Sequence, residues 1–273
     1  MKLYWLILLF LTPIITLKGI AQQPHACRIT NTAFVAGERV CYEVSYTWFF
    51  IWTDVGEACF TVDSDNRFGK TLLHLKATGK SYPFYDWFFK VRDLYESWVD
   101  PVSLSPHYYN RNIYEGGFTK ENEYWFNQPG DSVKIRVRRK GGPNKFVSVK
   151  SPGCLFDVVT AIYYSRCLNF SGIRQGTVFP VNVLMDEEIF NVKYRYLGKD
   201  VRKVTGIGKM ACLKFQVDLV AGDIFSTNQK LLVWVTDDAN KLPVYIESPI
   251  RVGSIQARLK SYQGLRHKLV SKN

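Results

Sequence analysis

The stretch Lys230–Tyr262, KLLVWVTDDANKLPVYIESPIRVGSIQARLKSY, carries the clearest strand pattern of the chain. The bulky and β-branched residues of Leu232–Thr236 favour an extended backbone, and Asp237–Lys241 supplies side chains that hydrogen-bond turn backbones. The chain returns over Leu242–Glu247, and from Gly253 to Tyr262 apolar and polar side chains alternate. This pattern predicts three antiparallel strands with one buried face and one solvent-facing face.

The same kind of pattern recurs upstream of this stretch. Runs rich in valine, tyrosine and phenylalanine begin at Arg39 and are separated by turn residues such as Asp63–Asn66. Only Leu155–Cys167 has apolar residues at helical spacing, after an N-cap candidate at Asp157. We therefore expect a mainly β protein, with antiparallel strands in a curved sheet, β-sandwich or open barrel, and one short helix at about 155–167 packed on it.

Two segments need a finer interpretation. Tyr82–Val99 is dense in aromatic residues and fits either a short helix around Phe84–Phe89 or a bent strand. After the predicted helix, strand patterns over Ile189–Leu197 and Val201–Gly206 predict two separate strands.

The first 21 residues have the pattern of an export signal. Lys2 gives a positive start, Tyr4–Leu17 is apolar, and Gly19–Ala21 offers small residues at a cleavage site. The apolar run is shorter than the about 20 residues that a membrane helix needs. We expect a signal peptide (1–21), a lead-in (22–36), one β-rich domain (37–262) and a basic tail (263–273). The mature chain is then exported, periplasmic or associated with the cell envelope, and soluble, with no transmembrane helix.

The chain is strongly basic. Its formal net charge is +12, and loss of Lys2 and Lys18 with the signal peptide leaves +10. An exported basic protein meets anionic lipid headgroups and glycans before it meets nucleic acid. We therefore expect an envelope lipid, glycan or protein as the partner, and no nucleic acid.

Cysteine usage agrees with an oxidising compartment. An even number of cysteines permits disulfides there, although the sequence leaves their pairing open and the alternative of free, buried thiols remains. The cysteines are Cys27, Cys41, Cys59, Cys154, Cys167 and Cys212.

Three strings of the sequence resemble one bacterial family. VAGERVCYEVSY (35–46), FDVVTAIYYSR (156–166) and VWVTDDANKLPVYIESPIRVGSIQARL (233–259) are similar to the exported family catalogued as domain of unknown function 3108. The resemblance extends over Gly37–Tyr262 and implies a mainly antiparallel β fold with one helix. The family brings no established activity, so the resemblance implies no functional residues.

Motifs of catalysis are lacking. Gly206–Ala211 matches the G-x-G-x-x-A string, but a dinucleotide site needs a helix directly after it, and the following residues alternate like a strand. We interpret these glycines as a hairpin turn. The four histidines have no metal-ligand spacing, and no C-x-x-C pair exists. The sequence predicts no catalytic residue, no metal and no cofactor.

Two features could bind a ligand. Aromatic residues gather in Tyr46–Trp52 and Tyr82–Phe89, where they could line an acyl pocket or stack on sugars, or simply fill the core. A basic stripe on one face of a predicted strand could meet anionic groups, or could prevent edge pairing. The candidate ligand-binding residues are Trp48, Phe50, Trp52, Tyr85, Trp87, Lys134, Arg136 and Arg138, and Lys140 continues the stripe.

These observations favour a non-catalytic exported envelope protein whose β scaffold binds an amphipathic lipid, a glycan or an envelope protein. One alternative is a carbohydrate-acting hydrolase with paired carboxylates drawn from Asp186, Glu188 or Asp238. A second alternative is a structural subunit whose aromatic face is an interface.

Overall fold

The computed structural model describes residues 29–126, 132–218, 230–249 and 253–270. These residues form two helices, α1 (Pro83–Phe89) and α2 (Val158–Arg166). They also form the strands β1 (Arg39–Trp48), β2 (Ile51–Arg67), β3 (Lys70–Ser81), β4 (Val91–Val99), β5 (Pro106–Glu115), β6 (Phe118–Phe126), β7 (Ser132–Arg139), β8 (Lys145–Lys150), β9 (Val178–Met185), β10 (Glu188–Val204), β11 (Gly208–Asp218), β12 (Lys230–Thr236), β13 (Pro243–Pro249) and β14 (Ser254–Gln263).

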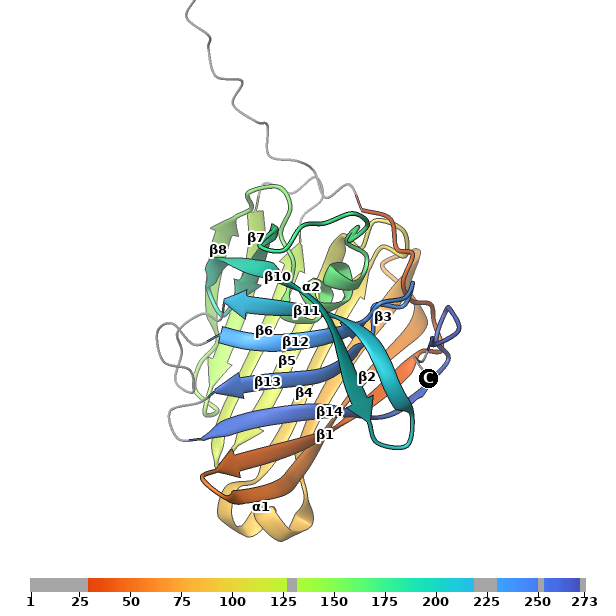
Figure 1. Ribbon diagram of the computed structural model, residues 1–273. Coiled ribbons are helices and arrows are strands. Elements are labelled where there is room, and N and C mark those ends of the chain that lie inside the picture. The colour runs from red at the N-terminus through yellow and green to blue at the C-terminus, as the bar shows by residue number, and fades with distance from the viewer. Residues whose placement is uncertain (1–28, 127–131, 219–229, 250–252, 271–273) are drawn as a thin grey trace, which may run out of the picture.

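All of these strands belong to one 14-stranded sheet with the order β8-β7-β6-β5-β4-β3-β2-β1-β14-β13-β12-β11-β10-β9. Each strand pairs with its chain neighbour except β8 and β9, which form the two edges of the sheet. The first and last strands pair with each other, so the two halves of the chain join along β1 and β14. The sheet curves until its two arms face each other with α2 between them (Figure 1). The expected antiparallel β fold is confirmed, in the form of one curved, open sheet.

Side chains link the two arms of the open sheet. Asp186, in the turn between β9 and β10, accepts a hydrogen bond from Arg111 Nη2 of β5 at 2.6 Å and another from Lys120 of β6. Lys145 of β8 forms an ion pair with Glu187 of the same turn at 3.2 Å. These contacts hold the two arms together where no backbone ladder does.

Alternation along the strands explains the faces of the sheet. In β7, Val133, Ile135 and Val137 are buried while Lys134 is exposed, as a period of two requires. The buried side chains join Tyr109 and others in the largest apolar cluster, which lies against α2. The core therefore occupies the concave side of the sheet.

Helix α2 is fixed to the sheet through its N-cap. Asp157 accepts from Thr160 N at 2.9 Å and from Ser97 Oγ of β4 at 2.7 Å, and all three groups are buried. The predicted cap is confirmed, but the helix begins at Val158 rather than at Leu155. Phe156 instead forms a bridge with Val183 of β9, because a capped helix cannot extend upstream of its cap.

Three further predictions from the sequence can be compared with the observed elements. The ambiguous segment contains both alternatives, with α1 followed by strand β4. The two strands expected over 189–206 are one strand, β10, which absorbs a bulge between Tyr196 and Gly198. The glycine-rich string at Gly206 is the β10–β11 turn followed by a strand, as expected.

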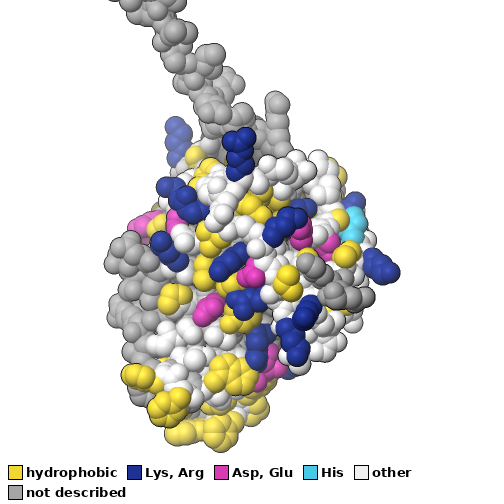
Figure 2. Space-filling view, in the orientation of Figure 1, with side chains coloured by type: hydrophobic (Ala, Val, Ile, Leu, Met, Phe, Trp, Pro, Cys, Tyr) yellow, Lys and Arg dark blue, Asp and Glu magenta, His cyan; other side chains and the backbone are white. Residues whose placement is uncertain are grey.

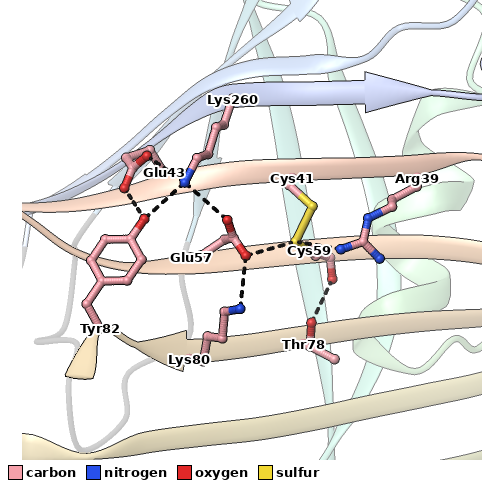
Figure 3. The surroundings of a disulfide bond; sticks show 9 residues. All are labelled: Arg39, Cys41, Glu43, Glu57, Cys59, Thr78, Lys80, Tyr82 and Lys260. Atoms are coloured by element: carbon pink, nitrogen blue, oxygen red, sulfur yellow. Dashed lines mark hydrogen bonds and ion pairs between the residues drawn. A yellow bond between two sulfur atoms is a disulfide. The ribbon is translucent and has the colours of Figure 1, made fainter. Parts of the chain in front are cut away.

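A disulfide joins Cys41 of β1 to Cys59 of β2, which lie directly opposite each other in the ladder. Arg39, Lys260 and two glutamates surround it (Figure 3). Cys154 is also disulfide-bonded. Cys167 and Cys212 are free and buried, and Cys27 lies outside the described residues.

No helix in the described part of the chain is long and apolar enough to cross a membrane. The expected signal peptide lies outside the described residues.

Candidate functional site

The concave side of the sheet contains a cavity of about 180 Å³ between α2 and the strands β1, β2 and β10 to β13. Leu231, Val233 and Val235 of β12 form one side of it. The rest of the wall is mainly apolar, and its aromatic members are Tyr42, Phe60, Tyr163, Phe170, Tyr194 and Phe215. The space equals roughly a dozen water-sized positions at about 10–15 Å³ each. Because this wall offers water few hydrogen bonds, the cavity suits an apolar group.

Strand register explains why these side chains converge. Phe215 lies opposite Val233 and Val217 opposite Leu231 in the β11–β12 ladder, so they share the concave face. From the other side, Ile162, Tyr163 and Arg166 of α2 reach the same space. They occupy neighbouring positions on a helical surface because residues three and four apart lie on one face.

A buried ion pair closes one part of the wall. Arg166 donates to both carboxylate oxygens of Glu38, at 2.5 and 2.9 Å, and its Nε donates to Asn240 O at 3.0 Å. Burial by itself lowers the pKa of Arg166, but the hydrogen bonds and charge of Glu38 outweigh it, and the pKa is raised. These two groups satisfy each other and are not available to a ligand.

Tyr163 of the cavity wall carries a hydroxyl that is shielded from solvent. It is buried and has no hydrogen-bond partner among the described residues, although its residue lines the wall. Burial raises the pKa of Tyr163, so the hydroxyl keeps its proton and can donate a hydrogen bond. A buried polar group without a partner costs about 1–3 kcal/mol, and a bound polar atom would remove that cost.

Lys241 adds a positive charge to the wall. It follows the β12–β13 turn, and its ammonium stands 6.0 Å from the centre of the Phe170 ring. No carboxylate in the described part of the chain forms an ion pair with it. The cavity therefore combines an apolar wall with one cation and a wall tyrosine whose buried hydroxyl has no partner among the described residues.

The predicted aromatic residues do not line this cavity. Phe50 and Trp52 lie at the β1–β2 turn and Tyr85 and Trp87 on α1, at the opposite end of β1 from the cavity residue Val40. The side chain of Trp48 lies outside what the structure describes. The structure thus brings the two aromatic segments of the sequence together, but on the surface.

The predicted basic residues lie elsewhere again. They belong to β7, which β6, β5, β4, β3 and β2 separate from β1 in the sheet. Arg136 forms an ion pair with Glu123 and Arg138 with Glu121 on β6, while Lys134 stands 5.6 Å from the Phe146 ring centre. Cross-strand partners therefore occupy the two arginines of the stripe.

The carboxylates considered for hydrolysis do not converge either. Asp186 is paired with Arg111 of β5 and Lys120 of β6, and Glu188 is exposed on β10. Asp238 accepts from Thr236 Oγ1 at 2.7 Å and from Asn240 N at 3.0 Å within its own turn. Each has a structural partner or faces solvent.

A different carboxyl pair does form, between neighbouring strands. Asp93 of β4 lies close to Glu115 of β5, and burial together with the charge of this second carboxyl raises the pKa of Asp93 to about 7. Neither residue lines the cavity. No group of three or more metal-ligating side chains occurs among the described residues.

Sequence reasoning missed the cavity residues. One signal was present, because β12 is apolar on both faces and so must be covered on both. Which of the covering side chains leave a space between them depends on the curvature of the sheet and the position of α2, which no local pattern encodes.

Fold and site together define an open, curved β-sheet protein with an internal apolar cavity. Residues 41–260 match the family described as "Protein of unknown function (DUF3108)", and the chain belongs to that family. No curated protein matches the chain in sequence. A similar solved structure is the β-barrel-like protein of domain of unknown function DUF1849 from Brucella abortus. It has a TM-score of 0.56 and 5% identity, and the match covers 85% of this chain and 98% of that one. This likeness concerns the fold alone.

Proposed function

We propose that this protein is an exported, non-catalytic binding protein of the cell envelope, which holds the apolar chain of an anionic amphipathic lipid in its internal cavity. The observation that carries the proposal is the aromatic and aliphatic cavity between α2 and β12, with Tyr163 and Lys241 in its wall.

The apolar wall supports the chain of the ligand. Each buried CH₂ group contributes about 0.8 kcal/mol, so a few carbons in this space already give measurable affinity. The volume of about 180 Å³ accommodates part of an acyl chain rather than a whole lipid. The polar end of the ligand would therefore lie at the wall or outside it.

The polar groups of the wall support the head of the ligand. Lys241 can pair with a carboxylate or phosphate, and the Tyr163 hydroxyl can donate one hydrogen bond. A glycan fits less well, because it needs many hydrogen bonds and the other polar groups are occupied. Arg166 is bound to Glu38, and the Tyr42 hydroxyl donates to Pro243 O at 3.0 Å.

The proposed location in the cell envelope is supported by the export signal expected from the sequence and by the disulfide. The expected export signal precedes the fold, and a disulfide such as Cys41–Cys59 persists in oxidising compartments outside the cytosol. Lipids and their anionic headgroups are abundant there.

Two variants test the two ends of the ligand in the full mature chain. Displacement of a fluorescent fatty acid measures affinity for a long-chain fatty acid and for the matching fatty alcohol. Val233→Phe fills the cavity, and we expect it to weaken both ligands at least about tenfold, since it removes the space for several CH₂ groups. Lys241→Gln should weaken only the acid.

Matched controls make the result specific. Val201→Phe enlarges an exposed valine on β10, and Lys209→Gln removes a lysine of β11 that does not line the cavity. Both should bind like the unaltered protein. The proposal fails if the unaltered protein binds neither ligand, or if Val233→Phe and Val201→Phe bind equally.

A further inference from the structure

Two aromatic segments far apart in the sequence meet at one end of the molecule. The β1–β2 turn and helix α1 lie together at the lower end of the view in Figure 1. Tyr82 N donates to Val55 O at 2.9 Å, and the Tyr85 hydroxyl is hydrogen-bonded to Thr53 Oγ1 of β2. The relative position of the two segments is therefore fixed by direct contacts.

Helix α1 uses only part of its aromatic set for anchoring. Tyr85 and Phe89, four residues apart, lie on the face that touches the sheet. The Phe89 ring lies so close to Gly116 that any Cβ there would collide with it, and Gly116 also has a φ of +55°. No residue of α1 is buried.

The other aromatic side chains of α1 point away from the fold. Phe84, Trp87 and Phe88 are 73%, 81% and 78% exposed. At the adjacent turn, Phe50 is 96% exposed. We call the exposed set the aromatic tip; it consists of Phe49, Phe50, Trp52, Phe84, Trp87 and Phe88.

The aromatic tip is large for a protein surface. The six aromatic side chains, of about 150–250 Å² each and 48% to 96% exposed, present roughly 900 Å² of apolar area. The largest apolar patch of an ordinary monomer is about 300–600 Å². Figure 2 shows hydrophobic side chains gathered at this end of the molecule. An area of this size indicates a binding surface rather than incidental exposure.

Charged groups surround the aromatic tip but do not interrupt it. Residues 46–53 of the turn contain no charged side chain. Behind them, Arg258 forms an ion pair with Asp54 at 2.7 Å and stands 4.3 Å from the Trp52 ring centre. Asp86 of α1 is paired with Arg92 of β4 at 2.5 Å, and Lys90 lies between the two elements in the sequence. Aromatic side chains in front of cations form the pattern of an interfacial membrane anchor.

The shape and charge of the protein favour a lipid surface over a shaped protein partner. Neither of the two described cavities is lined by a residue of the aromatic tip. It consists of a turn and a short helix that project from one end of the sheet. The formal net charge of +10, which remains after loss of Lys2 and Lys18 with the expected signal peptide, is complementary to an anionic bilayer.

We propose that the aromatic tip is a membrane-docking surface that inserts into the headgroup–acyl boundary of an anionic lipid bilayer. The protein would then contact the membrane end-on, with the sheet standing away from it. This inference is independent of the cavity ligand, because no residue of the aromatic tip lines the cavity.

Flotation with vesicles tests docking directly. The mature protein is mixed with phosphatidylcholine vesicles that contain either no anionic lipid or about 30% phosphatidylglycerol. We expect flotation with the anionic vesicles and less with the neutral ones. The tip variant Phe50→Asn with Phe88→Asn should lose at least about tenfold in vesicle affinity, because two inserted aromatics are removed.

A matched variant controls for the loss of exposed aromatics as such. Phe68→Asn with Phe146→Asn changes two phenylalanines that are 54% and 58% exposed outside the aromatic tip. It should float like the unaltered protein. Quenching of tryptophan fluorescence by brominated lipid gives a second readout and should decrease in Trp87→Phe.

Several results would overturn the proposal. They are absence of flotation, equal loss in the tip and control variants, and concentration-dependent dimers that the tip variant abolishes without any vesicle binding. Selective co-sedimentation of the protein with an insoluble glycan would also overturn the proposal. Val233→Phe, which fills the cavity, should still float, so failure of docking and failure of lipid binding are separate outcomes.

Discussion

Glu38 and Arg166, which lie 128 residues apart in the chain, form a two-pronged ion pair that is almost completely buried. Glu38 precedes β1, at the joint between the two halves of the sheet, and Arg166 ends α2. The Arg166 guanidinium also stands 5.4 Å from the ring centres of Phe34 and Tyr163. This pair therefore ties the central helix to the start of β1, the strand at which the two halves of the sheet join.

Breaking this pair should be costly. Glu38→Gln leaves the Arg166 charge buried without its partner, and such losses amount to about 3–5 kcal/mol. We expect a decrease of that size in the free energy of unfolding, measured by urea titration. Asp237→Asn, which breaks the exposed pair with Lys199, should cost less than about 1 kcal/mol. Equal losses in the two variants would contradict the structural role of the buried pair.

Tyr163→Phe should separate stability from binding. It removes a buried hydroxyl that has no partner among the described residues, so the ligand-free protein should be unchanged or more stable by about 1 kcal/mol. The same variant should bind a fatty acid less tightly, since it cannot donate a hydrogen bond. Thermal unfolding without ligand and fatty-acid displacement measure the two effects. A large loss of stability would show that the hydroxyl is satisfied internally.

Asp93 should make stability depend on pH. Burial and the neighbouring Glu115 raise the pKa of Asp93 to about 7, whereas an unfolded aspartate titrates near about 3.9. The folded state thus binds this proton more tightly. The resulting stability is complete below about pH 4 and is lost as the pH rises through about 7.

Asp93→Asn removes this dependence, because an amide does not titrate in this range. Relative to the unaltered protein, the variant should gain melting temperature between about pH 5 and pH 8. Circular dichroism melts across this range measure the difference. A difference that stays constant with pH would show that Asp93 is already ionised in the folded state.

The two free cysteines should be inert in the folded protein. Cys167 and Cys212 are buried, and burial raises the pKa of Cys212 to about 11. Since the thiolate is the reactive form, iodoacetamide at about pH 8 should label neither residue until the chain is unfolded. Peptide mass spectrometry before and after denaturation identifies the labelled sites. Rapid labelling of Cys212 in the native state would indicate local opening of β11.

Local sequence patterns were sufficient for many elements of the fold. The alternation in β7 and the side chains of the β12–β13 turn have the structure that their residues favour, because a strand period and a turn hydrogen bond involve only near neighbours. The cap at Asp157 was visible for the same reason. The sequence did not show that β10 is one continuous strand, because its bulge at Gly198 depends on pairing with β11.

The sequence by itself determined the antiparallel β class, the strand faces and the aromatic segments that could bind something. Only the tertiary structure decided that β1 pairs with β14, that two aromatic segments form one tip, and that the aromatics of the cavity are a different set. The physical reason is the separation along the chain of the residues that interact. Periodicity and capping act between residues a few positions apart, whereas curvature, links between the two arms and cavities arise from contacts between residues more than a hundred positions apart, such as Glu38 and Arg166.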